Sequence, residues 1–204
     1  MGLLFKPEYL NRSEQVNLVA EIHRLLLVAP PFTPKMPRTG KPFSVRMTNC
    51  GPLGWVSDIA GYRYQKTHPE TGQPWPPIPE IVLRVWRELS AYPHPPEACL
   101  VNIYTPAAKM GLHQDRDEEV FDAPVLSLSL GDTCVFRIGG KNRNDPTRTI
   151  RLSSGDALVL GGEARLAFHG VERIIAGSSR LLPEGGRINL TLRRVSTPVR
   201  SPKE

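Results

Sequence analysis

The spacing of hydrophobic positions separates an N-terminal helical part of the chain from a C-terminal strand-rich part. Apolar residues recur every three or four positions over 13–28 and 79–91, which predicts two amphipathic helices. The residues expected on their buried faces are Val16, Val19, Ile22 and Leu26 in the first helix and Ile81, Val82, Val85 and Leu89 in the second. Ser13 is the expected N-cap of the first helix, and Pro79 suits the first turn of the second because that turn needs no backbone N–H.

From about Leu100 onward, short runs of apolar and β-branched residues alternate with turn-forming residues. The predicted strands are Leu100–Tyr104, Val125–Leu130, Thr133–Ile138, Thr149–Leu152, Ala157–Leu160 and Arg187–Val195. Many short strands without helices between them indicate a β-sandwich or jelly roll. The expected fold class is therefore α+β, mainly β.

The length and the cysteines narrow the class of protein. A chain of 204 residues can bury a core of its own as one domain. Cys50, Cys99 and Cys134 lack metal-ligand spacing, and we expect them to be buried or idle thiols in a reducing compartment. The N-terminal sequence is interrupted by charge too early for a signal peptide, and no apolar run is long enough to span a membrane. These features predict a cytoplasmic protein with no membrane partner.

The chain is basic, with a formal net charge of +6 and a pI near 9.5. No acidic residue occurs between Glu21 and Asp58. The cations in that stretch are Arg24, Lys35, Arg38, Lys41 and Arg46. The stretch is also rich in proline, which favours an irregular surface segment suited to phosphate groups, although an ordinary solvated loop has the same composition.

His113 and Asp115 follow a predicted strand and a glycine turn, in an H-x-D motif. In extended backbone, residues i and i+2 point to the same side, so both side chains can approach one ion. His169 is a candidate third ligand. Two histidines and one carboxylate are the facial set that binds non-haem Fe(II) and leaves positions open. A zinc hydrolase uses similar residues, and an isolated H-x-D motif also occurs without any metal.

Polar residues occupy every second position of the last predicted strand, with apolar residues between them. The polar residues are Arg187, Asn189, Thr191 and Arg193. They share one face of the strand, which is either a solvent-exposed edge or a binding surface. Paired arginines near a metal match a dicarboxylate such as 2-oxoglutarate, because each can bind one carboxylate. Asn102 and Tyr104 alternate in the same way and can add neutral hydrogen bonds.

Several tracts of the sequence, in one order, resemble the AlkB family of DNA and RNA dealkylases. They are MTNCGPLGW (47–55), GYRY (61–64), PWPPIP (74–79), NIYTPAAKMGLHQDRDE (102–118), GGKNRNDP (139–146), GDALVLGGEARLAFHG (155–170) and RINLTLR (187–193). The resemblance covers roughly residues 43–195. It implies a double-stranded β-helix core, N-terminal helices and a nucleotide-recognition lid. The expected division is 1–94 for the helices and lid, 95–196 for the dioxygenase core and 197–204 for a flexible tail.

The resemblance also implies a site and a reaction. Fe(II) would be bound by His113, Asp115 and His169, and 2-oxoglutarate by Asn102, Tyr104, Arg187, Asn189 and Arg193. Decarboxylation of 2-oxoglutarate, with O2 as the other cosubstrate, would be coupled to hydroxylation of an N-alkyl group that leaves as an aldehyde. The expected substrate is alkylated DNA in single-stranded form, with RNA as an alternative, and the expected state is a monomer.

The substrate residues implied by the resemblance are Trp55, Tyr62, Tyr64, Asp117 and Arg143. Trp55 and His169 would enclose the damaged base, although Trp55 alone also fits an ordinary core position. The sequence departs from the family pattern at Ile103, Leu160 and Ile188, which puts substrate choice and pocket packing in doubt. Two alternatives stay open: the same chemistry on RNA or protein, and a nucleic-acid-binding module without catalysis.

Overall fold

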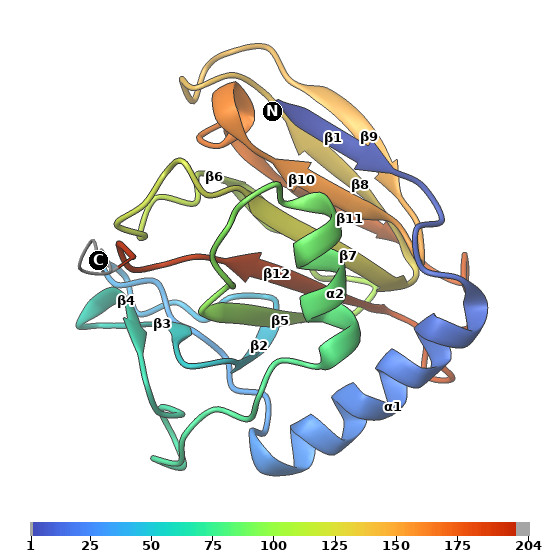
Figure 1. Cartoon of the computed structure of the whole chain (residues 1–204), viewed down its shortest axis with the longest axis horizontal. Helices are drawn as coiled ribbons and strands as arrows, with labels where there is room; N and C mark the ends of the chain where they lie inside the picture. The colour runs from blue at the N-terminus through green and yellow to red at the C-terminus, as the bar shows by residue number, and fades with distance from the viewer. Residues whose placement is uncertain (1, 199–204) are drawn as a thin grey trace, which may run out of the picture.

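The computed structural model describes residues 2–198 and has two β-sheets facing each other (Figure 1). The larger sheet has six strands in the order β1-β10-β7-β12-β5-β2. Its strands are β1 (Leu3–Lys6), β2 (Arg46–Cys50), β5 (Ala98–Tyr104), β7 (Val125–Gly131), β10 (Ala157–Leu160) and β12 (Arg187–Arg193). All neighbours are antiparallel, as expected for a jelly roll.

The smaller sheet has four strands in the order β6-β11-β8-β9. Its strands are β6 (Met110–His113), β8 (Thr133–Ile138), β9 (Arg148–Leu152) and β11 (His169–Ile175), with a short 3₁₀ helix, η1 (Gly162–Ala164), between β10 and β11. A separate hairpin of β3 (Gly54–Asp58) and β4 (Gly61–Gln65) stands beside the two sheets. The prediction of a mainly β jelly-roll core with few helices is confirmed.

Two helices cover the outer face of the larger sheet (Figure 1). The helix α1 spans Arg12–Val28 and α2 spans Glu80–Leu89. The cap of α1 is Asn11, not Ser13 as predicted: its side chain accepts from the Glu14 backbone N–H at 3.0 Å, and the Glu14 carboxylate accepts from the Asn11 N–H at 2.9 Å. This reciprocal pair satisfies two backbone donors at once, so the helix begins at the earlier residue.

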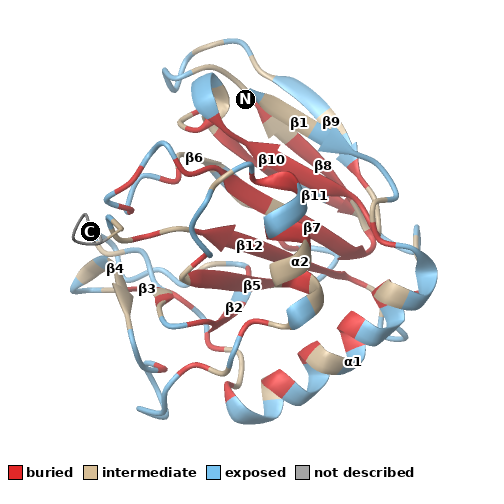
Figure 2. Ribbon diagram, in the orientation of Figure 1, coloured by how far each residue is buried: buried red, intermediate tan, exposed pale blue. Residues whose placement is uncertain are grey.

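The buried face of α1 also differs from the prediction at one position. Val16 is 48% exposed, whereas Gln15 is buried. The Gln15 amide donates to the Leu10 carbonyl at 2.7 Å and accepts from the Ser154 hydroxyl at 2.7 Å, so this polar side chain is satisfied inside the protein. Of the other predicted positions, Val19 and Ile22 are buried and Leu26 is partly buried, and the burial stripe along α1 is visible in Figure 2.

The strand β12 lies in the middle of the larger sheet, between β7 and β5, and all its residues are buried. Its polar face is therefore inside the protein and is not a solvent-exposed edge. Its apolar residues Ile188, Leu190 and Leu192 pack towards the helices. The alternation found in the sequence thus separates a helix-facing core from a polar interior between the sheets.

The division of the chain at residue 94 stays a prediction. Strands from both sides of it share the larger sheet, because β1 pairs with β10 and β2 pairs with β5. Of the expected tail over 197–204, residues 199–204 lie outside the described residues. Cys50, Cys99 and Cys134 are buried and free. Within residues 2–198, no helix is long and apolar enough to cross a membrane.

Candidate active site

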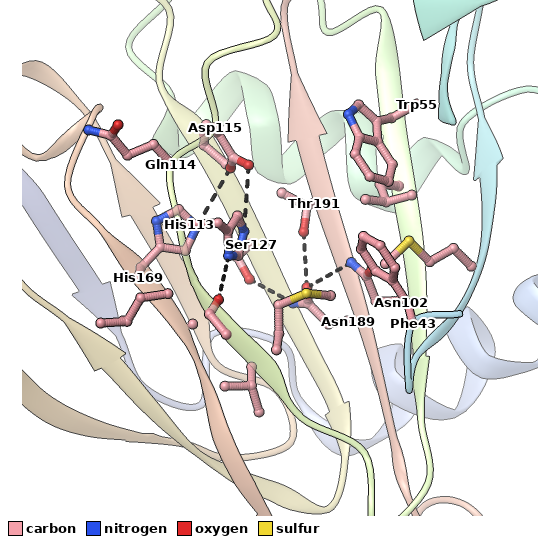
Figure 3. Close-up of a pocket in the computed structure, with 18 of the residues that line it drawn as sticks. Phe43, Trp55, Asn102, His113, Gln114, Asp115, Ser127, His169, Asn189 and Thr191 are labelled. Atoms are coloured by element: carbon pink, nitrogen blue, oxygen red, sulfur yellow. Dashed lines mark hydrogen bonds and ion pairs between the residues drawn. The ribbon is translucent and has the colours of Figure 1, made fainter. Parts of the chain in front are cut away.

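A cavity of about 810 Å³ opens between the two sheets, beside the β3–β4 hairpin (Figure 3). All of the residues predicted from the sequence to bind metal, cosubstrate or substrate line this one cavity. They come from both sheets, the hairpin and the loops that follow β6 and β8. The fold therefore brings together residues that are up to 138 positions apart, from Trp55 to Arg193.

The three predicted metal ligands meet at one point in the cavity. His113 and His169 are directly opposite each other in the antiparallel pair of β6 and β11, and their ring centroids are 4.5 Å apart. Asp115 follows β6, with one carboxylate oxygen 3.9 Å from His113 Nε2 and the other 3.8 Å from His169 Nε2. One candidate ligand atom from each residue lies within 4.8 Å of the others. The pairing of β6 with β11 thus brings together two histidines that are far apart in the sequence.

Both histidines are held in the tautomer that suits a metal ligand. Nδ1 of His113 lies 2.9 Å from the Gly111 carbonyl, and Nδ1 of His169 lies 2.9 Å from the Ala167 carbonyl. A carbonyl only accepts, so each Nδ1 carries the proton and each Nε2 offers a lone pair. Burial, assisted by the neighbouring His113, lowers the pKa of His169 to about 4, which keeps this imidazole neutral at neutral pH.

Asp115 is held as a carboxylate. Burial, the largest single influence, would raise its pKa. The Arg193 cation, whose Nη2 donates to Asp115 Oδ1 at 2.8 Å, acts together with His169, His113 and Arg165, and the net shift is downward. The side chain is only 7% exposed. A buried, ionised carboxylate between two neutral imidazoles is the donor set that divalent iron requires.

Arg187 is a buried cation whose protein partners are all neutral. The residue is 2% exposed. Its guanidinium donates to the Ser129 hydroxyl at 2.7 Å and to the Leu152 and Asp132 backbone carbonyls at 3.2 and 3.5 Å. Within residues 2–198 no carboxylate pairs with it. A buried charge without a counter-ion is costly, so this position favours an anionic ligand.

Polar side chains of β12, β5 and β7 form a connected network at the cavity (Figure 3). Asn189 lies opposite Asn102 in the β12–β5 pair, and their side chains are 3.4 Å apart. Thr191 and Ser127 also bond to Asn189, at 2.9 and 2.7 Å. Tyr104 lies opposite Arg187, and burial raises the pKa of its phenol, which therefore stays protonated. These contacts fix the orientation of the groups that line the cavity floor.

Four buried polar atoms have no hydrogen-bond partner among the described residues, and all four belong to predicted ligand residues. They are Asn102 Oδ1, Asp115 Oδ2, Arg187 Nε and Arg193 Nε. Buried polar groups in native proteins are nearly always satisfied, so a cluster of unsatisfied ones marks where a ligand binds. One acceptor lies in the metal set and two donors are on arginines, which fits a metal ion together with a carboxylate ligand. The residues present therefore fit Fe(II) and 2-oxoglutarate.

The β3–β4 hairpin presents an aromatic face to the cavity. Trp55 and Tyr64 are cross-strand partners, and Tyr62 stacks on Trp55 with ring centroids 5.6 Å apart and an interplanar angle of 18°. Trp55 lies across the cavity from His169 (Figure 3). This placement excludes the reading of Trp55 as an ordinary core residue, because the ring lines the cavity and is not sealed inside the core.

Asp117 and Arg143 lie at the exposed edge of the cavity. Asp117 accepts from the Trp55 indole N–H at 2.8 Å, so it also fixes that ring. Arg143 donates to the Leu112 carbonyl at 3.1 Å and lies over the Phe168 ring. Their contacts with a substrate stay predictions.

The basic stretch found in the sequence divides in the structure. Lys35, Arg38, Lys41 and Arg46 are exposed on the segment around 35–46, and Lys41 lines the cavity. Arg24 is exposed on α1 and is not part of the cavity lining. Two further exposed cations, Lys109 and Arg116, do line it. Lys41, Lys109 and Arg116 form a cationic rim of the cavity, which therefore combines residues from three separate places along the chain.

The three departures from the family pattern are not equivalent in the structure. Ile103 and Ile188 are cross-strand partners that pack on the helix-facing core. Their side chains point away from the cavity, and their effect on substrate choice stays open. Leu160 alone of the three lines the cavity.

Several residues of the site were not identified from the sequence. Ser127 and Ser129 lie on β7 and face β12, and the alternation of serine with leucine in that strand was an available signal. Glu118 and Arg165 are buried near Asp115 and pair at 3.0 Å. The sequence holds no sign that these two charges are buried, because burial arises from elements distant along the chain.

Comparison with known proteins agrees with this geometry. Residues 2–193 match the 2OG-Fe(II) oxygenase superfamily. An alpha-ketoglutarate-dependent dioxygenase AlkB homolog of Caulobacter vibrioides is 61% identical over 82% of this chain and 76% of its own. AlkB of Escherichia coli is 43% identical over 80% of this chain and 77% of its own. A solved structure of OsALKBH1 is 33% identical, with a TM-score of 0.82 over 95% of this chain and 96% of the other.

The jelly-roll fold and the His-Asp-His cluster define an Fe(II)- and 2-oxoglutarate-dependent dioxygenase. The chain belongs to the 2OG-Fe(II) oxygenase superfamily and, within it, to the AlkB-type dioxygenases. The prediction of an enzyme of this class, using Fe(II), 2-oxoglutarate and O2 for oxidative dealkylation, is confirmed. The non-catalytic alternative is not supported.

Proposed function

We propose that this enzyme removes N-alkyl groups from the bases of single-stranded DNA and acts as a monomer in the cytoplasm. The observation that carries the proposal is that one cavity holds a His-Asp-His cluster, a buried unpaired arginine and a stacked aromatic pair under a cationic rim. The metal cluster and the arginine account for the oxidation. The aromatic pair and the rim match a flat base on an anionic backbone. The free buried thiols agree with a reducing compartment.

The proposed ligand roles follow from the donor set. His113, Asp115 and His169 would hold Fe(II), which supplies activation of O2 and hydroxylation of the alkyl carbon when bound. Two arginines would hold the two carboxylates of 2-oxoglutarate: Arg187 the distal one and Arg193 the one beside the keto group. Asn102, Tyr104 and Asn189 would add neutral hydrogen bonds.

The protein's own contribution is positioning. Arg187 lies deep in the cavity, and its partners among the described residues are neutral, so the distal carboxylate would be fixed without competition from an acid of that part of the chain. Protonated Tyr104, opposite Arg187 in the sheet, can donate a hydrogen bond without adding charge. The helices packed on the outer face of the larger sheet exclude water from the side of the sheet opposite the cavity. These features leave the hairpin side as the entrance for the substrate.

A target base must leave the stack to reach the metal ligands. Stacking on Trp55 would recover part of that free energy, about 1–3 kcal/mol for an aromatic–base contact. Tyr62 and Tyr64 extend the aromatic face. Asp117 adds a negative charge beside Trp55, which favours a base made cationic by alkylation. Arg143 and Lys41, at the edge of the cavity, suit the phosphates of the flanking strand.

Formation of succinate tests the proposal directly. Purified enzyme with Fe(II), 2-oxoglutarate and O2 is given N-methylated and unmethylated oligonucleotides of one sequence, each single-stranded, duplex and as RNA. Stimulation of succinate and formaldehyde by the methylated single strand is expected. Equal or greater stimulation by RNA, or by a methylated peptide, would move the proposal to that substrate. Analytical ultracentrifugation at working concentration tests the monomer.

A further inference from the structure

Four charged side chains are buried together beside the metal cluster. Asp115, Glu118, Arg165 and Arg193 have side chains that are at most 7% exposed. Arg193 donates to Asp115 at 2.8 Å, and its Nε lies 3.3 Å from Glu118. Arg165 pairs with the other oxygen of Glu118 at 3.0 Å. Two acids and two bases make the group neutral, so removing any one member leaves a buried charge unmatched.

Arg165 holds the segment that carries the metal ligand. Its guanidinium donates to the backbone carbonyl of Asp115 at 2.6 Å and to that of Ala123 at 2.9 Å, in addition to the Glu118 carboxylate at 3.0 Å. These three acceptors span both ends of the loop over 115–123. The planar fork of arginine can reach all three at once, and a lysine cannot. The position of Asp115 therefore depends on a side chain fixed just after η1.

Glu118 connects this group to the substrate hairpin. One of its carboxylate oxygens accepts from the Tyr64 hydroxyl on β4 and faces Arg193 Nε, while the other pairs with Arg165. The second contact of the hairpin with the same loop, Trp55 to Asp117, is exposed and separate. Glu118 thus lies between the hairpin and the arginine assigned to 2-oxoglutarate.

We propose that Glu118 and Arg165 are positioning residues that couple the β3–β4 hairpin, through Tyr64, to Asp115 and Arg193. The proposal rests on the proposed roles of Asp115 and Arg193. Metal binding and cosubstrate binding change the charge balance at those two residues. The same Glu118 oxygen faces both Arg193 and Tyr64, so a change at Arg193 alters the hydrogen bond to Tyr64. Loading of metal and cosubstrate therefore tightens the aromatic face before a base arrives.

Buried ion pairs add little net stability. We therefore infer that the pair of Glu118 and Arg165 serves to position neighbouring residues. A merely structural pair would set the thermal stability of the protein without linking ligand occupancy to the hairpin. The two cases separate in a measurement on the hairpin itself. Hydrogen exchange of the backbone amides over 54–65 is such a measurement, and it needs no turnover and no nucleic acid.

The test compares exchange with and without Mn(II), a redox-stable substitute for Fe(II), plus 2-oxoglutarate. In the native protein, loading should slow exchange of the hairpin amides by about tenfold, the effect of one charge-assisted hydrogen bond. Tyr64→Phe removes only the hydroxyl and should abolish that response. Tyr62→Phe is the matched control on the same hairpin, because the described structure gives its hydroxyl no hydrogen-bond partner, and it should respond like the native protein.

Arg165→Lys and Glu118→Gln test the other end of the coupling. Arg165→Lys keeps the charge and should still fold, but it should weaken Mn(II) binding by about tenfold because Asp115 is less well placed. Glu118→Gln should behave like Tyr64→Phe in hydrogen exchange. An unchanged response in Tyr64→Phe, or no response to loading in the native protein, would overturn the proposal. A failure of the nucleic-acid assay would leave this test unaffected, so the two proposals fail separately.

Discussion

The two halves of the cavity are built on different principles. The half that holds the metal and cosubstrate residues consists of sheet strands: β12 is central, its residues are buried, and each polar side chain is fixed by a partner. The half that faces the substrate consists of a separate hairpin and loops, where Tyr62 is 48% exposed and Asp117 and Arg143 are exposed.

The buried strands and the exposed hairpin are therefore suited to different roles, catalysis and substrate recognition. A rigid, buried scaffold fixes chemistry to within a fraction of an ångström, whereas an exposed hairpin can change its contacts at little cost to the fold. Changes in the buried half should therefore remove catalysis, and changes in the exposed half should alter selectivity.

The largest effect is expected from the metal ligands. Asp115→Ala and His169→Ala should each reduce succinate formation to background, while circular dichroism shows an intact fold. Each removes one of the three donor residues that meet at the site. His23→Ala, an exposed histidine on α1, is the control and should be fully active. Normal turnover in purified His169→Ala would disprove the assignment.

The two arginines should be distinguishable from each other. Arg187→Ala should raise the apparent KM for 2-oxoglutarate by roughly 10–150-fold, which corresponds to about 1.5–3 kcal/mol for a charge-assisted contact. Among the described residues Arg187 has no acidic partner, so its loss should not lower the melting temperature. Arg193→Ala leaves Asp115 without the cation that pairs with it, although Glu118 keeps Arg165, and should lower the melting temperature. The exposed Arg173→Ala should change neither quantity. Equal melting temperatures for Arg187→Ala and Arg193→Ala would contradict this expected difference between the two arginines.

Acid should destabilise the buried half selectively. The folded protein holds His169 neutral down to a pKa of about 4, whereas the unfolded chain protonates it near 6.5. Between these values the unfolded state binds more protons, so stability falls as the pH falls from about 6.5 to 4. The loss is at most about 3 kcal/mol. Thermal unfolding of chelator-treated protein at a series of pH values measures this loss, with the His169→Gln variant as the reference. If stability falls with pH in the same way in both proteins, the assignment to His169 is wrong.

Trp55→Ala should change recognition and leave the metal chemistry intact. We expect the preference for methylated over unmethylated strands to fall by an amount equivalent to about 1–3 kcal/mol of lost stacking. Slow decarboxylation without substrate should continue at the native rate, because the ring is not part of the buried half. Competition binding with both strands, followed by the substrate-free succinate assay, checks each part. Retained lesion preference would remove Trp55 from the proposed site.

The smallest effect is expected at the cationic rim. Lys41→Gln should reduce the slope of log affinity against log salt by about 0.7 on single strands, the value for one lost phosphate contact. Arg24→Gln carries the same charge change on α1, outside the cavity lining, and should leave the slope unaltered. Equal slopes for both variants would show that the rim adds only general charge.

Much of the site was predictable because its signals are local. The alternation of polar and apolar residues in β12 predicted one shared face, and that face does line the cavity. The spacing of His113 and Asp115 predicted side chains that meet, and they do. Fold class followed from the same short-range patterns. The strands β6 and β11 were not among the predicted elements, because glycine and polar residues interrupt their apolar pattern.

Other features depended on packing between distant elements. The sequence could not show whether the polar face of β12 was solvated, since that depends on β5 and β7 lying on either side. It placed the cap of α1 at Ser13 and not Asn11, because both residues suit a cap and only backbone geometry chooses. It also could not separate Leu160, which reaches the cavity, from Ile103 and Ile188, which do not.

The sequence by itself determined the chemistry available to this protein: two histidines, a carboxylate and paired arginines, in strand-forming segments. Local periodicity encodes which side chains share a face, so these residues could be identified from one chain. Only the tertiary structure decided that, within residues 2–198, Arg187 lacks a counter-ion while Arg193 has two. Only it placed Glu118 between Tyr64 and Arg165. Burial and charge pairing arise from segments far apart along the chain, and no local pattern records them.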